Sequence, residues 1–281
     1  PSQRSNHRYN TADYLNVDPL LGTNEEFEVL CREAAKYGIG IVLDGVFSHT
    51  GSDSRYFNRE GRYGDGGAYR DPNSPYRSWY DFDPKYKGGY RSWWGFETLP
   101  EVNEENPSYV EFITGEGGVI DTWLRRGAAG FRLDVADELP DDFIEKIRAA
   151  VKRVSPEKFL LGEVWEDATT KYGFGQRRTY LLGKGLDSVM NYPFKNAVLD
   201  FVKGKPAEQA IGEILSICEH YPAPAMDTAL NFLSTHDTER ALTVIADEPA
   251  NGRGREWQSG RCVVGEAYEE GMLRLRMAYA I

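Results

Sequence analysis

The chain has 281 residues, of which 41% are hydrophobic and 27% charged, a composition typical of a globular protein with a sizeable core. Its formal net charge of −11 argues against nucleic acid or an anionic membrane surface as a main partner, because both select clustered Lys and Arg. No stretch approaches the roughly 18 apolar residues of a membrane span. We therefore expect no nucleic-acid partner, no membrane partner and a neutral ligand.

The cysteines and the chain ends carry little information about function. Cys31, Cys218 and Cys262 are odd in number, widely spaced and free of any C-x-x-C pattern, which predicts neither a metal cluster nor a disulfide framework. The sequence opens at Pro1 and stops inside a helical run, so we expect both ends to be cut. The compartment is therefore left undetermined.

Helical and strand-like patterns alternate along the first part of the chain. Residues 24–38 have apolar side chains at helical spacing and end at Gly38, a suitable helix C-cap. Residues 39–47 form a continuous apolar run, which is typical of a parallel strand covered on both faces. A long irregular stretch, residues 51–105, follows and is rich in aromatic side chains.

The alternation continues to the end of the chain. The patterns predict a helix over 106–127, a strand over 130–135, a helix over 141–155, a strand over 159–165, a helical segment near 168–182, a strand over 186–192, helices near 194–203 and 206–220, a strand over 229–237, an insertion around 247–262 and a last helix. Strands separated by helices indicate a parallel sheet with right-handed crossovers. The GEGG and GDGG sequences are interpreted as turns, because no G-x-G-x-x-G follows any strand.

Polar residues recur where the predicted strands end. Arg132 and Asp134 lie two positions apart, so they share one face of their strand. Buried charges are costly unless they are paired or used, which leaves a structural ion pair and a functional site both open. The strand ends carry Asp44 and His49, Arg132 and Asp134, Glu163 and Trp165, Asp187 and Asn191, and His236 and Asp237. Such a recurrence is typical of the active-site face of a barrel, and we therefore predict a site.

The predicted strand ends carry acidic residues but no cluster of cysteines or histidines. This combination is compatible with two classes of reaction. Asp44, Glu163 and Asp187 would serve as ligands of a hard metal in metal-assisted enolisation. In glycoside hydrolysis, one carboxylate is the nucleophile and a second carboxylic acid protonates the leaving oxygen. The aromatic stretch favours sugar, because a pyranose offers a flat C–H face and a rim of hydroxyls. Most of those aromatics are expected to form a small core of their own.

Six segments occur in the order of one known family and span essentially the whole chain. They are SNHRYNTADY (5–14), DGVFSH (44–49), LPEVN (99–103), GFRLDVADE (130–138), GEVWED (162–167) and FLSTHD (232–237). With them the sequence resembles the α-amylase family of glycoside hydrolases, in its neopullulanase and amylopullulanase branch. The resemblance implies an α/β fold: a partial TIM (β/α)8 barrel, strands three to seven, with an inserted irregular domain after the third strand.

The same resemblance implies a division of the chain and a consequence for stability. Residues 1–50 would begin the barrel fragment, residues 51–105 would form the inserted aromatic-rich domain, and residues 106–281 would complete the fragment. The first, second and eighth strands would be absent. An open barrel has unpaired edges, so we expect the isolated chain to be inactive or poorly folded although its parent is an active glycosidase.

The resemblance also assigns roles to single residues. Asp134 would be the nucleophile, Glu163 the acid/base and Asp237 the carboxylate that stabilises the transition state, while Asp44 would be structural at the site. Arg132 would hold Asp134 ionised, because a nearby cation favours the charged form. The substrate-binding residues implied are Tyr9, His49, Arg132, Glu138, Trp165, His236 and Arg240.

Two departures from the family pattern bear on metal binding. In calcium-dependent members an asparagine precedes the histidine of the first motif, and a histidine stands four residues after the nucleophile. Ser48 and Glu138 occupy those positions here. We therefore predict no metal at the usual site and no cofactor, and leave calcium elsewhere in the full-length protein open. Glu138 also indicates the branch that handles pullulan and cyclodextrins.

The predicted function is retaining hydrolysis of α-glucosidic bonds in starch, pullulan, maltodextrins or cyclodextrins by double displacement. The Asp134 and Glu163 carboxylates should then lie roughly 5–5.5 Å apart. The alternatives are a transglycosylase on the same site and a catalytically dead relative that serves as an adaptor or glucan-binding module. An α-glucan is the expected partner; a homodimer of the full-length enzyme and the choice between α-1,4 and α-1,6 bonds are left open.

Overall fold

A computed structural model describes residue 5 and residues 7–246, 255–260 and 265–281. The chain divides into two compact units. The first comprises Pro1–Glu163 and Tyr172–Asp187, and the second comprises Val164–Lys171 and Ser188–Ile281. Within the described ranges, no helix is both long and apolar enough to cross a membrane.

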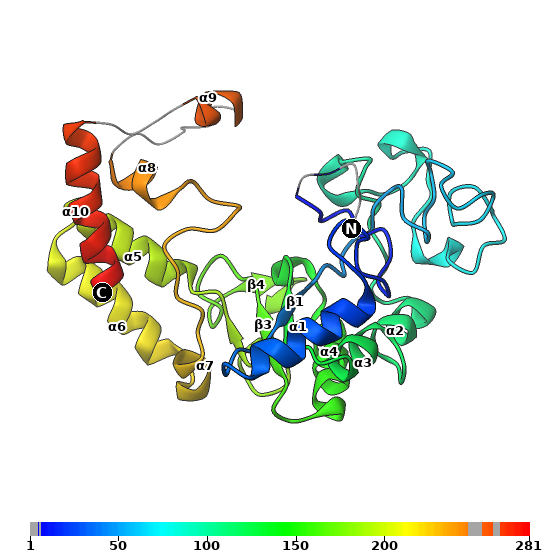
Figure 1. The fold of residues 1–281 in the computed structure, drawn as a ribbon, viewed down its shortest axis with the longest axis horizontal. Helices are drawn as coiled ribbons and strands as arrows, with labels where there is room; N and C mark the ends of the chain where they lie inside the picture. The colour runs from blue at the N-terminus through cyan, green and yellow to red at the C-terminus, as the bar shows by residue number, and fades with distance from the viewer. Residues whose placement is uncertain (1–4, 6, 247–254, 261–264) are drawn as a thin grey trace. The chain divides into compact units, whose positions relative to one another are not determined.

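Three parallel strands lie in the core of the first unit (Figure 1). They are β1 (Val42–Gly45), β2 (Gly130–Leu133) and β3 (Phe159–Gly162), and β2 pairs with both of the others. Every residue of β2 is buried, as expected for a strand covered on both faces. The register places Asp44 of β1 opposite Arg132 of β2. The three strands predicted here are confirmed, each shorter than the apolar run that indicated it. The prediction that residues 39–47 are covered on both faces is wrong, because Val42 and Asp44 of β1 are exposed.

The helix predicted to end at Gly38 is confirmed as α1 (Asn24–Ala35). It begins with a capping box, in which the Thr23 side chain accepts from the Glu26 backbone and the Glu26 side chain accepts from the Thr23 backbone. Gly38 follows the last turn with a φ of 72°, a left-handed conformation that suits glycine beyond a helix end.

The single helix predicted over residues 106–127 is wrong, because the chain forms α2 (Pro107–Thr114) and α3 (Val119–Arg125) instead. The break falls on the GEGG sequence. Gly117 has a φ of 73°, and a Cβ on Gly118 would lie 2.7 Å from a backbone oxygen of α2. Both positions therefore require glycine, and the interpretation of GEGG as a turn is confirmed.

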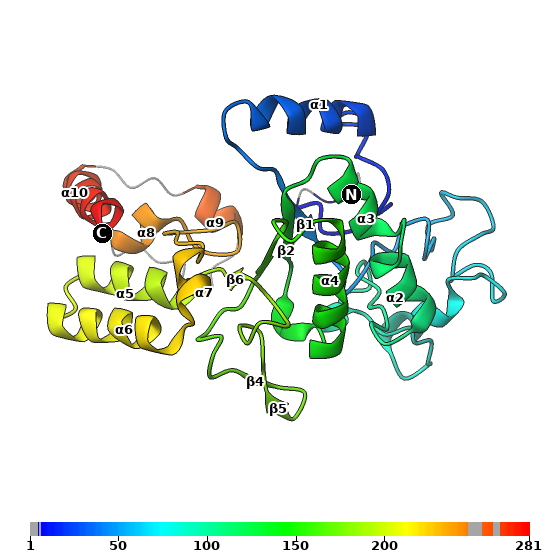
Figure 2. The same cartoon turned by 90° about the horizontal axis from the view of Figure 1, so that it is seen from below.

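The helix predicted over residues 141–155 is confirmed as α4 (Asp141–Val154). It packs against α2 and α3 (Figure 2). Its buried apolar side chains are Phe143, Ile144, Ile147, Ala150 and Val151. Their spacing places them on one face of the helix, which is the face that packs in the core.

Residues 51–105 fold as turns with three short 3-10 helices, Arg77–Trp79, Lys87–Gly89 and Trp93–Gly95. Several of their aromatic side chains are buried: Tyr56, Phe57, Trp79, Tyr80 and Tyr90. The Phe57 ring is fully buried, with the ring centroids of Tyr80 and Tyr90 at 4.8 and 4.6 Å. Phe57, Tyr80 and Tyr90 therefore form an aromatic cluster within the stretch, whereas Tyr56 and Trp79 pack on rings outside it, those of Tyr14, Tyr109 and Phe112.

The helical segment predicted near residues 168–182 is wrong, because residues 172–177 form an antiparallel hairpin. Its strands are β4 (Tyr172–Gly173) and β5 (Gln176–Arg177). The two turn residues, Phe174 and Gly175, have φ values of 52° and 77°. Positive φ at both positions is the signature of a type I′ turn, whose twist suits a tight hairpin.

The second unit is mainly helical. Its elements are β6 (Ser188–Val189), α5 (Tyr192–Val202), α6 (Ala207–His220), α7 (Ala223–Asp227), α8 (Ala241–Ile245), α9 (Arg255–Ser259) and α10 (Glu266–Ala280). Helices α5 and α6 run side by side (Figures 1 and 2), and side chains of α5, α8 and α10 share an apolar core. The insertion predicted around 247–262 lies mostly outside the described residues.

The strand predicted over residues 229–237 is reduced to one parallel bridge, between Met190 and Leu230. The apolar residues that suggested a strand pack against helical side chains instead. The Phe232 ring meets the Tyr192 ring at 4.8 Å, and Leu233 contacts the apolar core of this unit. Tertiary packing therefore overrides the strand propensity of the segment.

Candidate active site

Arg132 is the centre of a charged cluster in the first unit. Its Nη1 lies 2.7 and 2.9 Å from the two carboxylate oxygens of Asp44 and 3.0 Å from Oδ1 of Asp134. Its Nη2 lies 2.8 Å from Oε2 of Glu163. The sheet explains this convergence, because Asp44 is opposite Arg132 and the other two acids directly follow β2 and β3. One guanidinium therefore faces three carboxylates.

The backbone hydrogen bonds between the parallel strands continue for one residue past the strand ends, and they include the amides of Asp134 and Glu163. The Asp134 amide donates to the Gly45 carbonyl at 3.2 Å, and the Glu163 amide donates to the Leu133 carbonyl at 3.0 Å. Each acid is held at the C-terminal end of its strand. Asp134 is 7% and Glu163 2% exposed, so both carboxyl groups are largely removed from water.

The pKa of Asp134 is raised to about 7, first by burial and then by the neighbouring Asp44 carboxylate, with a further rise from Glu163. Arg132 lowers this pKa but offsets only part of the rise. Arg132 thus acts in the predicted direction, but the net pKa shift of Asp134 is upward. The sequence did not show how many carboxylates share the guanidinium.

Glu163 is fixed by the backbone that follows β2. Its Oε2 accepts a hydrogen bond from the Val135 amide at 2.9 Å. Val135 has a φ of 40°, a left-handed conformation that is strained for a β-branched residue. The strained residue next to Asp134 thus provides the donor that holds Glu163.

Tyr9 joins the cluster through Asp44. Its hydroxyl donates to Oδ2 of Asp44 at 2.7 Å and accepts from Nη1 of Arg132 at 3.4 Å. The pKa of Tyr9 is raised above its ordinary value by burial and by the Asp44 carboxylate. The phenol therefore keeps its proton at neutral pH and donates a hydrogen bond to Asp44.

His49 is buried, with an exposure of 2%. Its Nδ1 lies 2.9 Å from the Ser48 hydroxyl oxygen, and its ring centroid lies 5.5 Å from that of Trp93. Burial lowers the pKa of His49 to about 4, so the ring is neutral at neutral pH. Its Nε2 is buried and has no hydrogen bond within normal geometry among the described residues.

Glu138 binds two tryptophans that were not singled out from the sequence. Trp93 Nε1 donates to Oε2 of Glu138 at 2.5 Å, and Trp94 Nε1 donates to Oε1 at 2.8 Å. Trp94 is 76% exposed although its indole is anchored. The adjacent tryptophans just before the LPEVN segment are the sequence signal that could have identified this arrangement.

The remaining predicted site residues belong to the second unit. Trp165 stacks on Tyr192, with ring centroids 4.3 Å apart. His236 Nε2 lies 3.1 Å from Oδ2 of Asp237, and both side chains are exposed. Arg240 is the exposed residue before α8. The first unit by itself contains Tyr9, Asp44, His49, Arg132, Asp134, Glu138 and Glu163.

Asp187 does not belong to the charged cluster, contrary to the metal-site alternative that grouped it with Asp44 and Glu163. Its carboxylate accepts from Arg148 and Lys152 of α4, both at 2.7 Å, and from the Leu160 amide at 2.8 Å. These contacts fix α4 to β3. Across the described ranges, no group of three or more His, Cys, Asp or Glu residues is arranged to hold a metal ion.

Comparisons with known proteins identify the family of the chain. A family model described as "Alpha amylase, catalytic domain" matches residues 1–259. The amylopullulanase of Thermoanaerobacterium saccharolyticum is 38% identical over 278 residues, which cover 88% of this chain and 21% of that protein. Neopullulanase 2 of Thermoactinomyces vulgaris is 33% identical over 258 residues, covering 89% of this chain and 41% of the relative.

A solved structure is similar as well. The cyclic α-maltosyl-(1→6)-maltose hydrolase from Arthrobacter globiformis, in complex with cyclic α-maltosyl-(1→6)-maltose, superposes with a TM-score of 0.75 at 29% identity. The match covers 86% of this chain and 52% of that one. The chain thus spans about half or less of the length of the proteins it matches. On the strength of the family match, the chain belongs to the α-amylase catalytic-domain family, whose fold class is the TIM barrel.

Proposed function

We propose that the full-length protein is a retaining glycoside hydrolase that cleaves α-glucosidic bonds in α-glucans. The observation that carries this proposal is the gathering of Asp134 and Glu163, from the ends of adjacent parallel strands, around one guanidinium. A double displacement requires two carboxyl groups in different environments, one as the nucleophile and one as the acid/base. Similarity to an amylopullulanase, a neopullulanase and a maltosyl-maltose hydrolase supports an α-glucan substrate.

In the first step, ionised Asp134 attacks the anomeric carbon while Glu163 gives its proton to the glycosidic oxygen. The bond to the leaving sugar breaks as an ester bond to Asp134 forms. In the second step, water attacks the same carbon, Glu163 takes the proton, and Asp134 leaves as a carboxylate. Asp237 is proposed as the third carboxylate, which stabilises the positive charge on the ring in each transition state.

Neighbouring groups are proposed to orient the sugar. The buried Nε2 of His49 would bond a hydroxyl of the ring being cleaved, and Tyr9 would stack beneath that ring. Glu138 with Trp93 and Trp94, and Trp165, His236 and Arg240 in the second unit, are proposed as further substrate contacts. Asp44 is proposed as structural, because it shares Arg132 with the two catalytic acids.

Two further parts of the proposal concern the barrel and metal. We propose that β1, β2, β3, β6 and the segment around Leu230 are strands three to seven of the barrel, with residues 51–105 as an insertion. We also propose no calcium at the usual site, because the Ser48 oxygen lies against His49 and Glu138 accepts from two indoles. Loss of activity on chelation, restored by calcium alone, would contradict the second part.

Product analysis of the full-length protein tests the function. The protein is incubated with starch, pullulan and a cyclodextrin, and NMR follows the anomer that is released first. We expect the α-anomer; the β-anomer would contradict the double displacement. Panose from pullulan would identify α-1,4 cleavage and maltotriose would identify α-1,6 cleavage. Products longer than the substrate would favour transglycosylation, and no product from any substrate would favour the adaptor alternative.

A further inference from the structure

Arg178 is a buried cation of the first unit that lies outside the charged cluster, and the proposed mechanism does not use it. It directly follows the β4–β5 hairpin, and its side chain is fully buried although it carries a charge. A buried charge is costly unless it is paired and hydrogen-bonded. Its partners therefore show which part of the fold it stabilises.

All three nitrogens of the Arg178 guanidinium contact the segment from residue 137 to residue 141, which joins β2 to α4. Nε lies 2.8 Å from Oδ1 of Asp141, Nη1 donates to the Asp137 carbonyl at 2.8 Å, and Nη2 donates to the Leu139 carbonyl at 2.5 Å. The Tyr180 hydroxyl adds a hydrogen bond to Oδ1 of Asp137 at 3.0 Å. One guanidinium therefore fixes this segment at three positions.

The β4–β5 hairpin accommodates this side chain. A Cβ on Gly173 would lie 3.1 Å from Nη1 of Arg178, so glycine leaves room for the guanidinium against β4. The guanidinium carbon lies 5.2 Å from the ring centroid of Phe174 and 4.5 Å from that of Tyr180, distances at which an aromatic ring attracts a cation. The hairpin and the segment that Arg178 holds thus both determine its position.

Glu138 lies between the two residues whose carbonyls Arg178 binds. It belongs to a single 3-10 turn (Ala136–Glu138) that follows the strained Val135. One such turn has few hydrogen bonds of its own, so its conformation depends on contacts from outside. The contacts from Arg178 thus help to fix the position of the Glu138 carboxylate.

The Glu138 carboxylate in turn holds two tryptophans in place. Trp93 and Trp94 donate to its two oxygens at 2.5 and 2.8 Å. Trp94 has a φ of 51°, a left-handed conformation that is unfavourable for an aromatic residue, and it is 76% exposed. An exposed ring on a strained backbone contributes little to a core, and such strain is concentrated at binding and active sites. Glu138 therefore fixes a ring that a ligand can reach.

We propose that Arg178 is a positioning residue for sugar binding, which acts through Glu138 on the indoles of Trp93 and Trp94. Arg178 is fully buried, so it does not touch the substrate itself; it fixes the turn that carries Glu138, and Glu138 fixes the two rings. The inference rests on the proposed function, because it takes both rings as substrate contacts. A residue outside every motif quoted from the sequence should therefore affect KM for an oligosaccharide.

The test uses the full-length protein with Arg178→Lys, which keeps the charge. A lysine amine is a single point and cannot reach three separate acceptors as a planar guanidinium does. Tyr180→Phe is a milder second variant, which removes only the hydroxyl that donates to Asp137. It keeps the inference testable where Arg178→Lys lowers the amount of folded protein.

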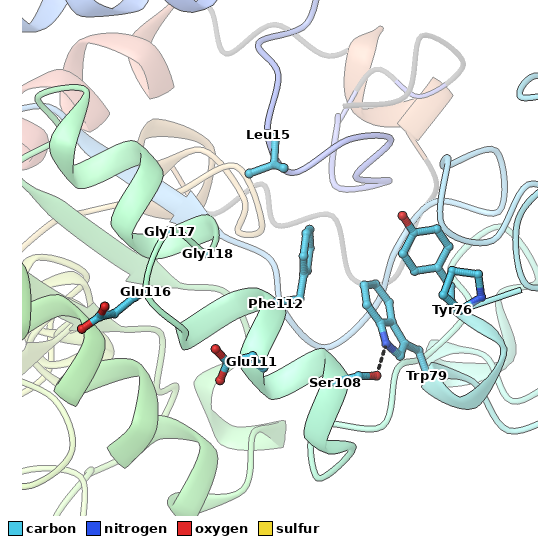
Figure 3. A pocket seen from close by; sticks show the side chains of 10 residues that line it. Leu15, Tyr76, Trp79, Ser108, Glu111, Phe112, Glu116, Gly117 and Gly118 are labelled. Carbon is cyan, nitrogen blue, oxygen red and sulfur yellow. Dashed lines mark hydrogen bonds between the residues drawn. The ribbon is translucent and has the colours of Figure 1, made fainter.

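Arg153→Lys is the matched control. Arg153 also binds two carbonyls and one aspartate: its Nη2 lies 2.9 and 3.1 Å from two carbonyl oxygens at the end of α2 and 2.8 Å from Oδ1 of Asp121. These contacts lie next to the turn of Gly117 and Gly118, which line a hollow of about 410 Å³ beside α2 (Figure 3). Glu138 does not line that hollow. The control thus removes the same set of bonds at a different place in the first unit.

Fluorine NMR of fluorotryptophan-labelled protein measures the positioning without a substrate. The signals of Trp93 and Trp94 are assigned with Trp93→Phe and Trp94→Phe. We expect both signals to shift in Arg178→Lys, to shift less in Tyr180→Phe and to stay unchanged in Arg153→Lys, because only the first two variants release the turn. Unchanged signals in both Arg178→Lys and Tyr180→Phe would overturn the inference.

Kinetics on maltoheptaose separate positioning from stability. In Arg178→Lys, KM should rise about three- to fivefold with little change in kcat, because uniform binding is lost and the chemical step is unaffected. In a Glu138→Ala background the same substitution should leave KM unchanged, because the connection to the rings is already removed. A merely structural role would reduce the amount of folded protein in both backgrounds without changing KM, and that result would overturn the inference.

Failure of the proposed function would give a different result. The wild-type protein would then release no product from maltoheptaose, while the fluorine signals would still respond to Arg178→Lys. Hydrolysis by the wild-type protein, with signals that do not respond to either variant, would overturn the role of Arg178 alone and leave the proposed function standing.

Discussion

Two ion-pair clusters at the ends of strands in the first unit differ in their charge balance. Asp187 is one carboxylate that meets two cations, Arg148 and Lys152, together with a backbone amide. Arg132 is one cation that meets three carboxylates. The first cluster is fully compensated, whereas the second has an excess of negative charge in a buried place.

The pKa directions follow from this balance. Burial alone would raise the pKa of Asp187, but hydrogen bonds from Lys152 and Arg148 bring it below its ordinary value. The pKa of Asp134 is raised to about 7 by burial and by the other carboxylates. The presence of a buried ion pair therefore does not show whether a cluster has a structural or a catalytic role. The two clusters differ instead in the sign of their net charge, which is negative around Arg132 and positive around Asp187.

The largest expected effect concerns the uncompensated cluster. Asp134→Asn in the full-length protein should lower kcat more than about a hundredfold, because the amide keeps the shape of the side chain but cannot form the ester. Binding of maltooligosaccharides should be retained. Steady-state kinetics and calorimetry measure the two quantities. A variant that keeps more than about a hundredth of kcat would show that another residue is the nucleophile.

Substitution in the compensated cluster should affect stability instead. Asp187→Asn leaves Arg148 and Lys152 without their carboxylate, and we expect the free energy of unfolding to fall by about 2 kcal/mol. The kcat of the folded enzyme should change less than about twofold. Chemical denaturation and kinetics of the same preparation check both. Loss of kcat without loss of stability would mean that Asp187 acts in the site.

The pH dependence of kcat/KM tests the cluster around Arg132 separately from the cluster around Asp187. Because the pKa of Asp134 is raised to about 7, this proposed nucleophile should be protonated at lower pH, and kcat/KM should fall as the pH drops through that value. Asp44→Asn removes a charge that raises this pKa and also frees Arg132 for Asp134. The acid limb should therefore move to lower pH. An unchanged limb would exclude Asp134 as the titrating group.

The smallest expected effect concerns the anchored tryptophan. Trp94→Ala should raise KM for maltooligosaccharides about three- to fivefold with little change in kcat, because it removes uniform binding. Trp94→Phe keeps a ring but loses the bond to Glu138, and should give an intermediate value. Tyr63→Ala, at an exposed aromatic of the same stretch, is the control. Equal effects of Ala and Phe would mean that the anchoring bond, not the ring area, matters.

Elements whose pattern was set by burial could be predicted from the sequence. Strands β2 and β3 have buried apolar runs, and α4 has a regular apolar stripe. Strand β1 was also predicted from an apolar run, although only Gly45 of it is buried. The secondary-structure predictions failed where the local structure is determined by a tight turn or by tertiary packing. Phe174 and Gly175 form a tight turn inside an apparently helical segment, and Phe232 packs on Tyr192 instead of pairing in a strand.

The sequence was sufficient to predict which residues form the charged cluster, but not the pKa values of its carboxyl groups. The spacing of Arg132 and Asp134 showed that they share a face, and the structure places both in one cluster with Glu163. The net pKa shift of Asp134 could not be predicted, because it depends on how many charges meet in space. The roles of Trp93 and Trp94 depend on a contact with Glu138 more than forty positions away, which no local pattern reveals.

The single pairing of β1 has a consequence for handling the 281-residue chain by itself. Among the described residues β1 pairs only with β2, and Ile39 and Val42 are 57% and 42% exposed. An open edge with apolar neighbours is a template for association of further chains, which the net charge of −11 opposes through repulsion at long range. At an ionic strength of about 0.1 M, salt screens charges that lie more than about 10 Å apart, and it affects the short-range pairing of strand edges much less. Light scattering of this 281-residue chain should therefore increase with ionic strength, and low-salt buffers should reduce that association.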